Sequence, residues 1–492
     1  MRYLGWIALF WSAAAFADTG VLKWAADPES GAPYSFYDPQ NPEVMKGYEL
    51  EIVRALAAEM GLRPEFVQNS WDGLILGLQR GAYDIAINGI EITEDRKKEV
   101  LFTSPYYVTG ERLTVLKENL DITKLEDVRG KAVGTLKYSV AQRMLDSMGG
   151  VDVRSYDSEL NAYEDLLNHR TQAVFIDDPI ALYYADTNPA FKSTGNLVGR
   201  LEYGIAVNKT RPEFYRSFQA ALEKIRDNGK LRTILERWKM WNRATAEEFG
   251  QDSVARSAPV EFESYVQTKD QSSGWKRKLG LYWMTLPILL KGAWMTLQIS
   301  VLSMLLATVL GLGLALVRLY GPGWSAALVT LYVEIMRGTP LLIQLFIIFY
   351  GLPKIGLEFS AFTAAVIGLG MNYAANESEN YRAGFQAIPR AQTEAAHSLG
   401  LSRWQTIRLI LFPQAMRIVL PPITNDFIAL IKDSSLVSVI TMTELTKAYG
   451  QMASTHYDYL GIGIIVAVIY LLLGLPWVRL SQWLEKKNYA KS

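Results

Sequence analysis

Hydrophobic and polar positions divide the chain of 492 residues into two parts with different patterns. In the first part, short apolar runs such as 21–25, 84–87 and 173–176 alternate with amphipathic segments such as 49–60. Strands and helices alternate in this way in α/β proteins. We therefore expect an α/β domain with substantial parallel sheet between about residues 21 and 241. Nearly all of the long apolar runs lie in the second part.

The long apolar runs predict about five membrane spans. They cover about residues 290–317, 339–357, 359–381, 409–431 and 460–480. Arginine and lysine gather on one side of these spans, which the positive-inside rule makes cytoplasmic. The residues that set this orientation are Arg318, Arg337, Arg382, Arg390, Arg403, Arg408, Arg479, Lys486 and Lys487. An odd number of spans then places the first part outside and the C-terminus inside.

Two further segments follow neither pattern. Met1-Arg2, an apolar stretch to Trp11 and small residues up to Ala17 are typical of a secretory signal, with cleavage expected after Ala17. This apolar stretch is shorter than the ~20 residues that a span requires. Residues 243–281 are polar and form a linker. The predicted organisation is a signal peptide over 1–17, a soluble domain over 18–245, a linker over 246–281 and a membrane domain over 282–492.

Composition excludes several classes of function. The 50 basic residues balance the 50 acidic ones, so the sequence favours neither nucleic acid nor an acidic polymer as partner. The chain has no cysteine, which excludes disulfides and thiolate chemistry. It also has no G-x-x-x-x-G-K-[ST] phosphate loop, because Gly130-Lys131 and Gly229-Lys230 lack the upstream glycine and the following hydroxyl. We expect no cofactor, no metal site and no catalytic residues.

A motif in the second part resembles the cytoplasmic loop by which permeases of ATP-binding-cassette (ABC) importers bind their ATPase. The pattern is E-A-A, three residues, G, nine residues and I-x-L-P, with Phe412 in place of the usual leucine. The matching loop residues are Glu394, Ala395, Ala396 and Gly400. An amphipathic helix before a proline-broken helix would also give Glu-Ala-Ala. Three further segments add to this resemblance, namely Arg337–Pro340, Pro421-Pro422 and 425–436. Together they resemble the polar amino acid permeases over about residues 285–485.

The first part resembles the periplasmic solute-binding proteins of family 3, which serve polar amino acid importers. The motifs occur in the family's order, as Gly47–Ile52, Trp71–Ile75, Gly81–Asp84, Ile92–Lys98, Ser104–Tyr107, Tyr203–Ala206 and Asp227–Lys230. The two resemblances together imply an α/β two-lobed periplasmic binding protein fold followed by an all-α membrane domain, the permease of a type I ABC importer. They imply closure of the two lobes, with hinges near Tyr107–Thr114 and Arg200–Val207.

A free amino acid is a zwitterion, so its site requires a cation, a carboxylate and a wall for the side chain. Arg96 stands at the family's arginine position and would bind the substrate carboxylate through two parallel hydrogen bonds. Its alternative role is a surface ion pair with Glu94 or Asp95. Asp177 would accept the ammonium group. Its alternative role is to cap a helix after a strand.

Other residues at family positions complete the expected site. Tyr34 and Trp71 would pack on the substrate side chain, unless they belong to the core. Gly89 and Ile90 would present backbone groups to the substrate. Ser139 would donate from the second lobe. Three residues depart from the family pattern, namely Gly31 in place of an aromatic residue, Glu91 in place of Ser or Thr, and Tyr138 in place of Gly. Glu91 either favours a basic ligand or points to solvent.

The implied function is amino acid uptake across the cytoplasmic membrane, with receptor and permease fused in one multi-pass subunit. The binding domain would lie on the periplasmic or extracellular side. ATP hydrolysis is expected on a separate ATP-binding subunit, and two permease domains, in a homodimer, would form the pathway. Asn425, Asp426 and Lys432 would line this pathway or pair with each other.

Two other classes join an amino acid receptor to membrane spans. A ligand-gated channel would insert its pore within the receptor, whereas here Trp238 closes the receptor motifs before the first span. A membrane-anchored sensor would need a signalling domain, and nothing after Leu484 is large enough. Neither class accounts for the Glu-Ala-Ala loop.

Overall fold

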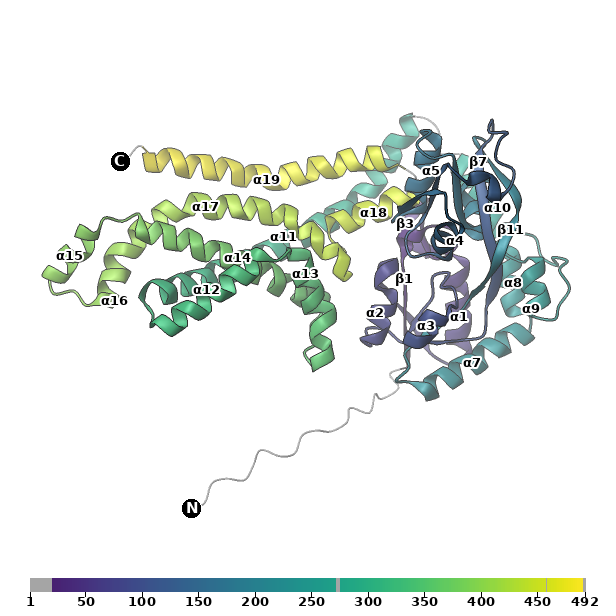
Figure 1. Ribbon diagram of the computed structural model, residues 1–492, viewed down its shortest axis with the longest axis horizontal. Coiled ribbons are helices and arrows are strands. Elements are labelled where there is room, and N and C mark those ends of the chain that lie inside the picture. Colours follow the sequence, from purple (N-terminus) through teal and green to yellow (C-terminus); the bar gives the residue numbers. More distant parts are fainter. Residues whose placement is uncertain (1–19, 271–274, 457, 490–492) are drawn as a thin grey trace, which may run out of the picture.

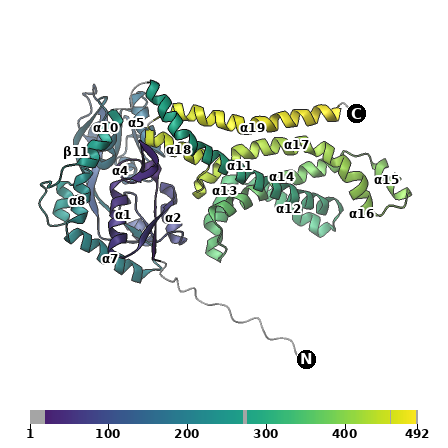
Figure 2. The same ribbon diagram turned by 180° about the vertical axis from the view of Figure 1, so that it is seen from behind.

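The computed structural model describes residues 20–270, 275–456 and 458–489. The predicted signal peptide lies outside the described residues. Two α/β lobes stand at one end of a bundle of long helices, as Figures 1 and 2 show from opposite sides. The α/β domain followed by a helical membrane domain is the fold class that the sequence predicts, and this prediction is confirmed.

The first lobe is built on a five-stranded sheet of order β4-β1-β5-β12-β6. Its strands are β1 (Val21–Ala26), β4 (Arg63–Gln68), β5 (Ile85–Ala86), β6 (Leu101–Phe102) and β12 (Ala206–Val207). β1 pairs in parallel with β4 and β5, while β12 is antiparallel to β5 and β6. The helices of this lobe are α1 (Tyr48–Glu59), α2 (Leu74–Gln79), α3 (Glu94–Glu99), α7 (Pro212–Asp227) and α8 (Lys230–Arg237). A hairpin of β2 (Phe36–Asp38) and β3 (Asn41–Lys46) lies beside it.

The second lobe has a five-stranded sheet of order β11-β7-β10-β8-β9. Its strands are β7 (Tyr107–Leu116), β8 (Ala132–Leu136), β9 (Asp152–Tyr156), β10 (Ala173–Asp177) and β11 (Phe191–Tyr203). Its helices are α4 (Val140–Met148), α5 (Glu159–Leu167) and α6 (Asp178–Tyr184). The chain enters this lobe through β7 and leaves it through β11, and these two strands pair with Tyr107 opposite Tyr203. Both predicted hinges therefore fall on paired strands.

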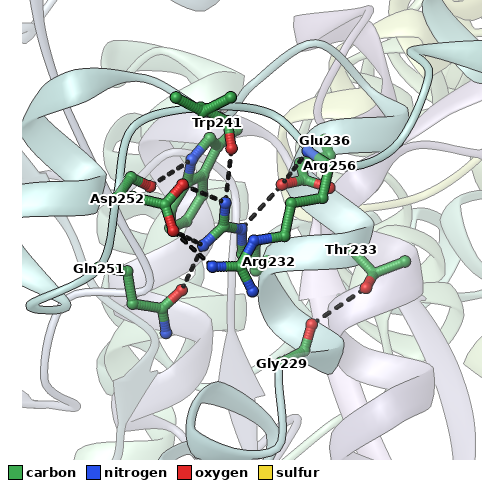
Figure 3. Close-up of polar contacts among 9 residues, drawn as sticks. Gly229, Arg232, Thr233, Glu236, Trp241, Gln251, Asp252 and Arg256 are labelled. Atoms are coloured by element: carbon green, nitrogen blue, oxygen red, sulfur yellow. Dashed lines mark hydrogen bonds and ion pairs between the residues drawn. The ribbon is translucent and has the colours of Figure 1, made fainter.

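The predicted linker contains two helices, α9 (Arg243–Glu248) and α10 (Val260–Asp270). The segment between them is held on the first lobe by Arg232, which is 5% exposed. Arg232 donates to Glu236 Oε1 at 2.8 Å and to Asp252 Oδ1 at 3.0 Å, and its guanidinium lies over the Trp241 ring (Figure 3). The first part of the linker thus packs on the binding domain.

The membrane domain contains α11 (Trp275–Tyr320), α12 (Gly323–Gly338), α13 (Leu341–Phe346), α14 (Ala361–Gln386), α15 (Arg390–Ser398), α16 (Arg403–Thr406), α17 (Phe412–Asp433), α18 (Leu445–His456) and α19 (Tyr459–Tyr489). Among the described residues, three helical stretches are long and apolar enough to span a membrane, at 278–320, 403–440 and 459–483. A fourth is counted if the pair 323–338 and 341–355, bent by 106°, forms one span.

This count is lower than the five spans that the sequence predicts. The predicted span over 359–381 corresponds to α14, whose second half carries polar residues such as Asn376 and Glu377. Glu377 is fully buried, because α14 packs among α11, α12 and α17. Neighbouring helices can cover polar groups in the middle of a bundle, so such a helix does not need a continuous apolar surface.

Candidate ligand site between the two lobes

Arg96, on α3 of the first lobe, pairs with Glu91. Its Nη1 donates to the Glu91 carboxylate and, at 3.0 Å, to the Glu91 backbone carbonyl. Glu94 and Asp95 pair instead with Lys97 and Lys98 at the surface, so Arg96 does not form the predicted alternative pair. The Arg96 guanidinium carbon also lies 5.4 Å from the centre of the Trp71 ring. Arg96 is thereby fixed by a carboxylate and an aromatic face.

Glu91 connects the first lobe to the second. It is 2% exposed, and its second carboxylate oxygen accepts the Val140 backbone N–H at 3.2 Å. Val140 is the first residue of α4, whose free N–H groups favour negative charge. The Ser139 hydroxyl caps this helix at Gln142 N and donates to the Leu136 carbonyl. In this structure the donor from the second lobe is therefore the Val140 N–H and not the predicted Ser139 hydroxyl. A serine is a typical N-cap, so its place in the sequence could have indicated the free N–H groups that follow it.

Asp177 ends β10 and is buried beside two other acidic groups. The Tyr203 hydroxyl donates to its carboxylate, and its side chain does not cap α6. Glu111 on β7 lies opposite Asp177 in the strand register and is fully buried. Burial, followed by the charge of Glu91, raises the pKa of Asp177 to about 7. Burial also raises the pKa of Glu111, and the charges of Asp177 and Glu91 add to this effect.

Glu111 is not among the site residues that the sequence predicts. The only signal in the sequence is an acidic residue within a segment rich in apolar and β-branched residues, and its burial is seen only in the structure. Its position opposite Asp177 depends on how β7 pairs with β10, which local pattern does not specify.

Tyr34 and Gly89 pack directly on each other. The Tyr34 hydroxyl lies 3.2 Å from the Tyr203 hydroxyl. Gly89 has φ +62°, and a Cβ at this position would lie 2.7 Å from the Tyr34 ring, so only glycine fits without strain. The Gly89 N–H donates to Glu49, and the Ile90 carbonyl accepts from Gly204 N. These two backbone groups are therefore already used within the first lobe.

An open pocket of about 460 Å³ lies beside this cluster. It is lined by Trp71, Asp72, Leu74, Ile75, Leu76, Ile90, Arg96, Glu99 and Tyr138. Tyr138, at the predicted departure from glycine, is 67% exposed and has φ +60°, the region that favours glycine. Gly31, the other small-residue departure, has φ +68°, and a Cβ there would meet the Tyr184 hydroxyl at 2.7 Å.

The predicted ATPase-binding loop lies at the opposite end of the helices from the two lobes (Figure 1). Glu394 and Ala395 are exposed on α15, whereas Ala396 is buried. Gly400 follows α15 with φ +79°. Leu399 is 83% exposed, which leaves an apolar side chain free on this surface. Within the bundle, Asp426 accepts a hydrogen bond from Asn380 at 2.9 Å.

Two α/β lobes that meet at a buried acidic cluster are attached to a bundle of apolar helices, which is the arrangement of a receptor domain joined to a membrane domain. Residues 22–240 match the family of bacterial extracellular solute-binding proteins, family 3. Residues 307–488 match the inner membrane component of binding-protein-dependent transport systems. The chain belongs to the permeases of amino acid ABC transporters and carries a family 3 solute-binding domain in the same polypeptide. The predicted fusion of receptor and permease is confirmed.

Individual relatives match the permease part. The probable amino-acid ABC transporter permease protein YckA of Bacillus subtilis (strain 168) is 42% identical over 41% of this chain and 89% of its own. The glutamine transport system permease protein GlnP of Escherichia coli (strain K12) is 39% identical over 42% of this chain and 94% of its own. Among solved structures, an ancestral arginine-binding protein bound to arginine is 33% identical over 44% of this chain and 98% of its own, with a TM-score of 0.42.

Proposed function

We propose that the two lobes capture one amino acid between Arg96 and Asp177 on the periplasmic or extracellular side and deliver it to the permease domain. The observation that carries this proposal is that a fixed cation of the first lobe and a buried carboxylate of the second belong to one cluster, joined through Glu91 and Tyr203. A ligand that contacts both lobes favours their closure. Tyr34, Trp71, Gly89, Ile90 and Ser139 would surround it.

We further propose that a separate ATPase subunit binds the loop Glu394–Gly400 and that two copies of the permease domain form the pathway. The position of this loop, far from the lobes in both views, supports receptor and ATPase sites on opposite sides of the membrane (Figures 1 and 2). Residues 1–17 would direct export of the binding domain. Fusion gives the receptor a high effective concentration beside the permease.

Uptake into proteoliposomes tests this proposal. The full chain and its ATPase subunit are reconstituted, and the accumulation of labelled amino acids is measured with and without ATP. The panel includes glutamine, arginine and cystine, for which relatives are named. We expect Glu394→Ala to abolish uptake while ligand binding is retained, and Arg96→Ala to abolish both. ATP-independent uptake, or full uptake by Glu394→Ala, would contradict the proposal.

A further inference from the structure

The pocket between the lobes carries more negative than positive charge. Among the described residues that line it, Arg96 is the only cationic side chain, whereas Asp72 and Glu99 are acidic. Arg96 is itself paired with the buried carboxylate of Glu91, which also accepts from the second lobe at Val140 N. An amino acid brings one ammonium and one carboxylate, which together leave this excess unchanged.

Glu91 already uses the groups that a ligand carboxylate would need. Its two oxygens accept from Arg96 on one lobe and from the Val140 N–H on the other. A carboxylate that is 2% exposed depends on such partners, because burial without them is costly. Glu91 thus fills the position in which a ligand carboxylate would be bound.

When a ligand carboxylate takes Arg96, Glu91 loses its cation. Its backbone remains bridged to Tyr203, and Ile92 N donates to Glu202 O at 2.8 Å, so the segment stays anchored. The ligand ammonium is used by Asp177. Glu91 then requires a second cation, and the only new source is the side chain of the ligand. The face of Trp71 beside Arg96 is suited to the same cation.

We infer that Glu91 determines specificity by becoming the counter-ion of a cationic ligand side chain, so that the receptor selects amino acids with a basic side chain. This inference rests on the proposed binding of an amino acid between Arg96 and Asp177. It assigns to Glu91 two successive partners, first Arg96 and then the ligand.

The test compares arginine with citrulline, which replaces the guanidinium by a neutral group of similar shape. Binding of both is measured by isothermal titration with the full chain in lipid nanodiscs. We expect wild type to favour arginine by about 30-fold or more, since loss of one partner of a buried charge pair has effects of this size. Glu91→Gln, and Glu91→Ser as a second variant, should bring the ratio close to one. Glu94→Gln, whose residue pairs with Lys97 at the surface, is the matched control and should leave the ratio unchanged.

Different failures have different meanings. Equal affinity of wild type for arginine and citrulline, or an unchanged ratio in both Glu91 variants, would overturn the role of Glu91 while amino acid binding stands. Agmatine, which lacks the carboxylate of arginine, should bind much more weakly than arginine. Equally tight binding of agmatine would overturn the displacement of Glu91 from Arg96. Failure of every amino acid to bind would overturn the proposed function itself.

Discussion

Lys447 is a buried contact between the receptor and the permease, and its removal should loosen the docking of the two. It lies on α18, is 7% exposed, and places its Nζ 2.9 Å from Glu29 Oε1 and 4.0 Å from Asp27 Oδ1. Asp27 also accepts the Trp71 backbone N–H at 2.8 Å, so this contact is continuous with the ligand pocket. Lys447→Met removes the charge and keeps most of the apolar stem.

The expected magnitude follows from burial. Loss of one partner of a buried, hydrogen-bonded charge pair costs about 2–5 kcal/mol. Burial already raises the pKa of Glu29, although Lys447 opposes this effect. Without Lys447, the carboxyl groups of Asp27 and Glu29 have lost their buried counter-ion, so their free energy falls when the receptor separates from the permease and water reaches them. The docking equilibrium should therefore weaken by about 30-fold or more. Lys291→Met is the matched control, because Lys291 and Glu43 are 71% and 66% exposed and solvent screens their attraction.

Cross-linking measures this docking directly, because the chain contains no cysteine of its own. Gln68 Oε1 and Thr443 Oγ1 lie 3.4 Å apart across the interface, so Gln68→Cys with Thr443→Cys should be joined by a short bifunctional thiol reagent, which spans the length lost with the glutamine side chain. We expect the rate to fall strongly when Lys447→Met is added and to stay near the parent rate with Lys291→Met. Equal rates for the parent and the Lys447→Met variant would refute this account of the interface.

Three further predictions concern the binding domain. The pKa of Asp177 is raised to about 7 in the folded domain, whereas a carboxyl group of the unfolded chain releases its proton near pH ~4. The stability that this group contributes is therefore lost as pH rises through about 7. Thermal unfolding should occur at a lower temperature at about pH 8 than at about pH 5. Arg232→Met should destabilise the domain by about 3 kcal/mol in denaturant unfolding, whereas Arg256→Met, at an exposed position, should have little effect. Gly89→Ala should weaken ligand binding in titrations, because the new Cβ meets the Tyr34 ring. Gly81→Ala is the control, since Gly81 has a similar φ and open space around it. It should lower the free energy of unfolding by the backbone cost of about 1–2 kcal/mol and leave ligand affinity unchanged.

The sequence was sufficient for those features that local pattern encodes. Alternation of apolar and polar positions indicated the α/β domain, and the motif at Glu394 indicated the permease. Arg96 lines the pocket in the structure, and its role toward a ligand stays a prediction. These features depend on residues that are close in the chain.

Tertiary contacts decided the rest. The partner of Arg96 is Glu91, which local spacing did not favour over Glu94 or Asp95. The place of Glu111 beside Asp177 depends on strand register, and the contact of Val140 with Glu91 joins different lobes. Length and composition count three or four spans among the described residues, against the five predicted, because α14 carries polar residues that its neighbours bury.

Ligand titration of the Asp177→Asn variant tests the central claim most directly. The full chain in nanodiscs is titrated with the amino acid that wild type binds most tightly, at about pH 8, where Asp177 is charged. We predict that affinity falls by about 30-fold or more while the unfolding temperature does not fall, because a neutral amide avoids the cost of a buried charge. Unchanged affinity in this variant would contradict the binding of an amino acid ammonium between the two lobes.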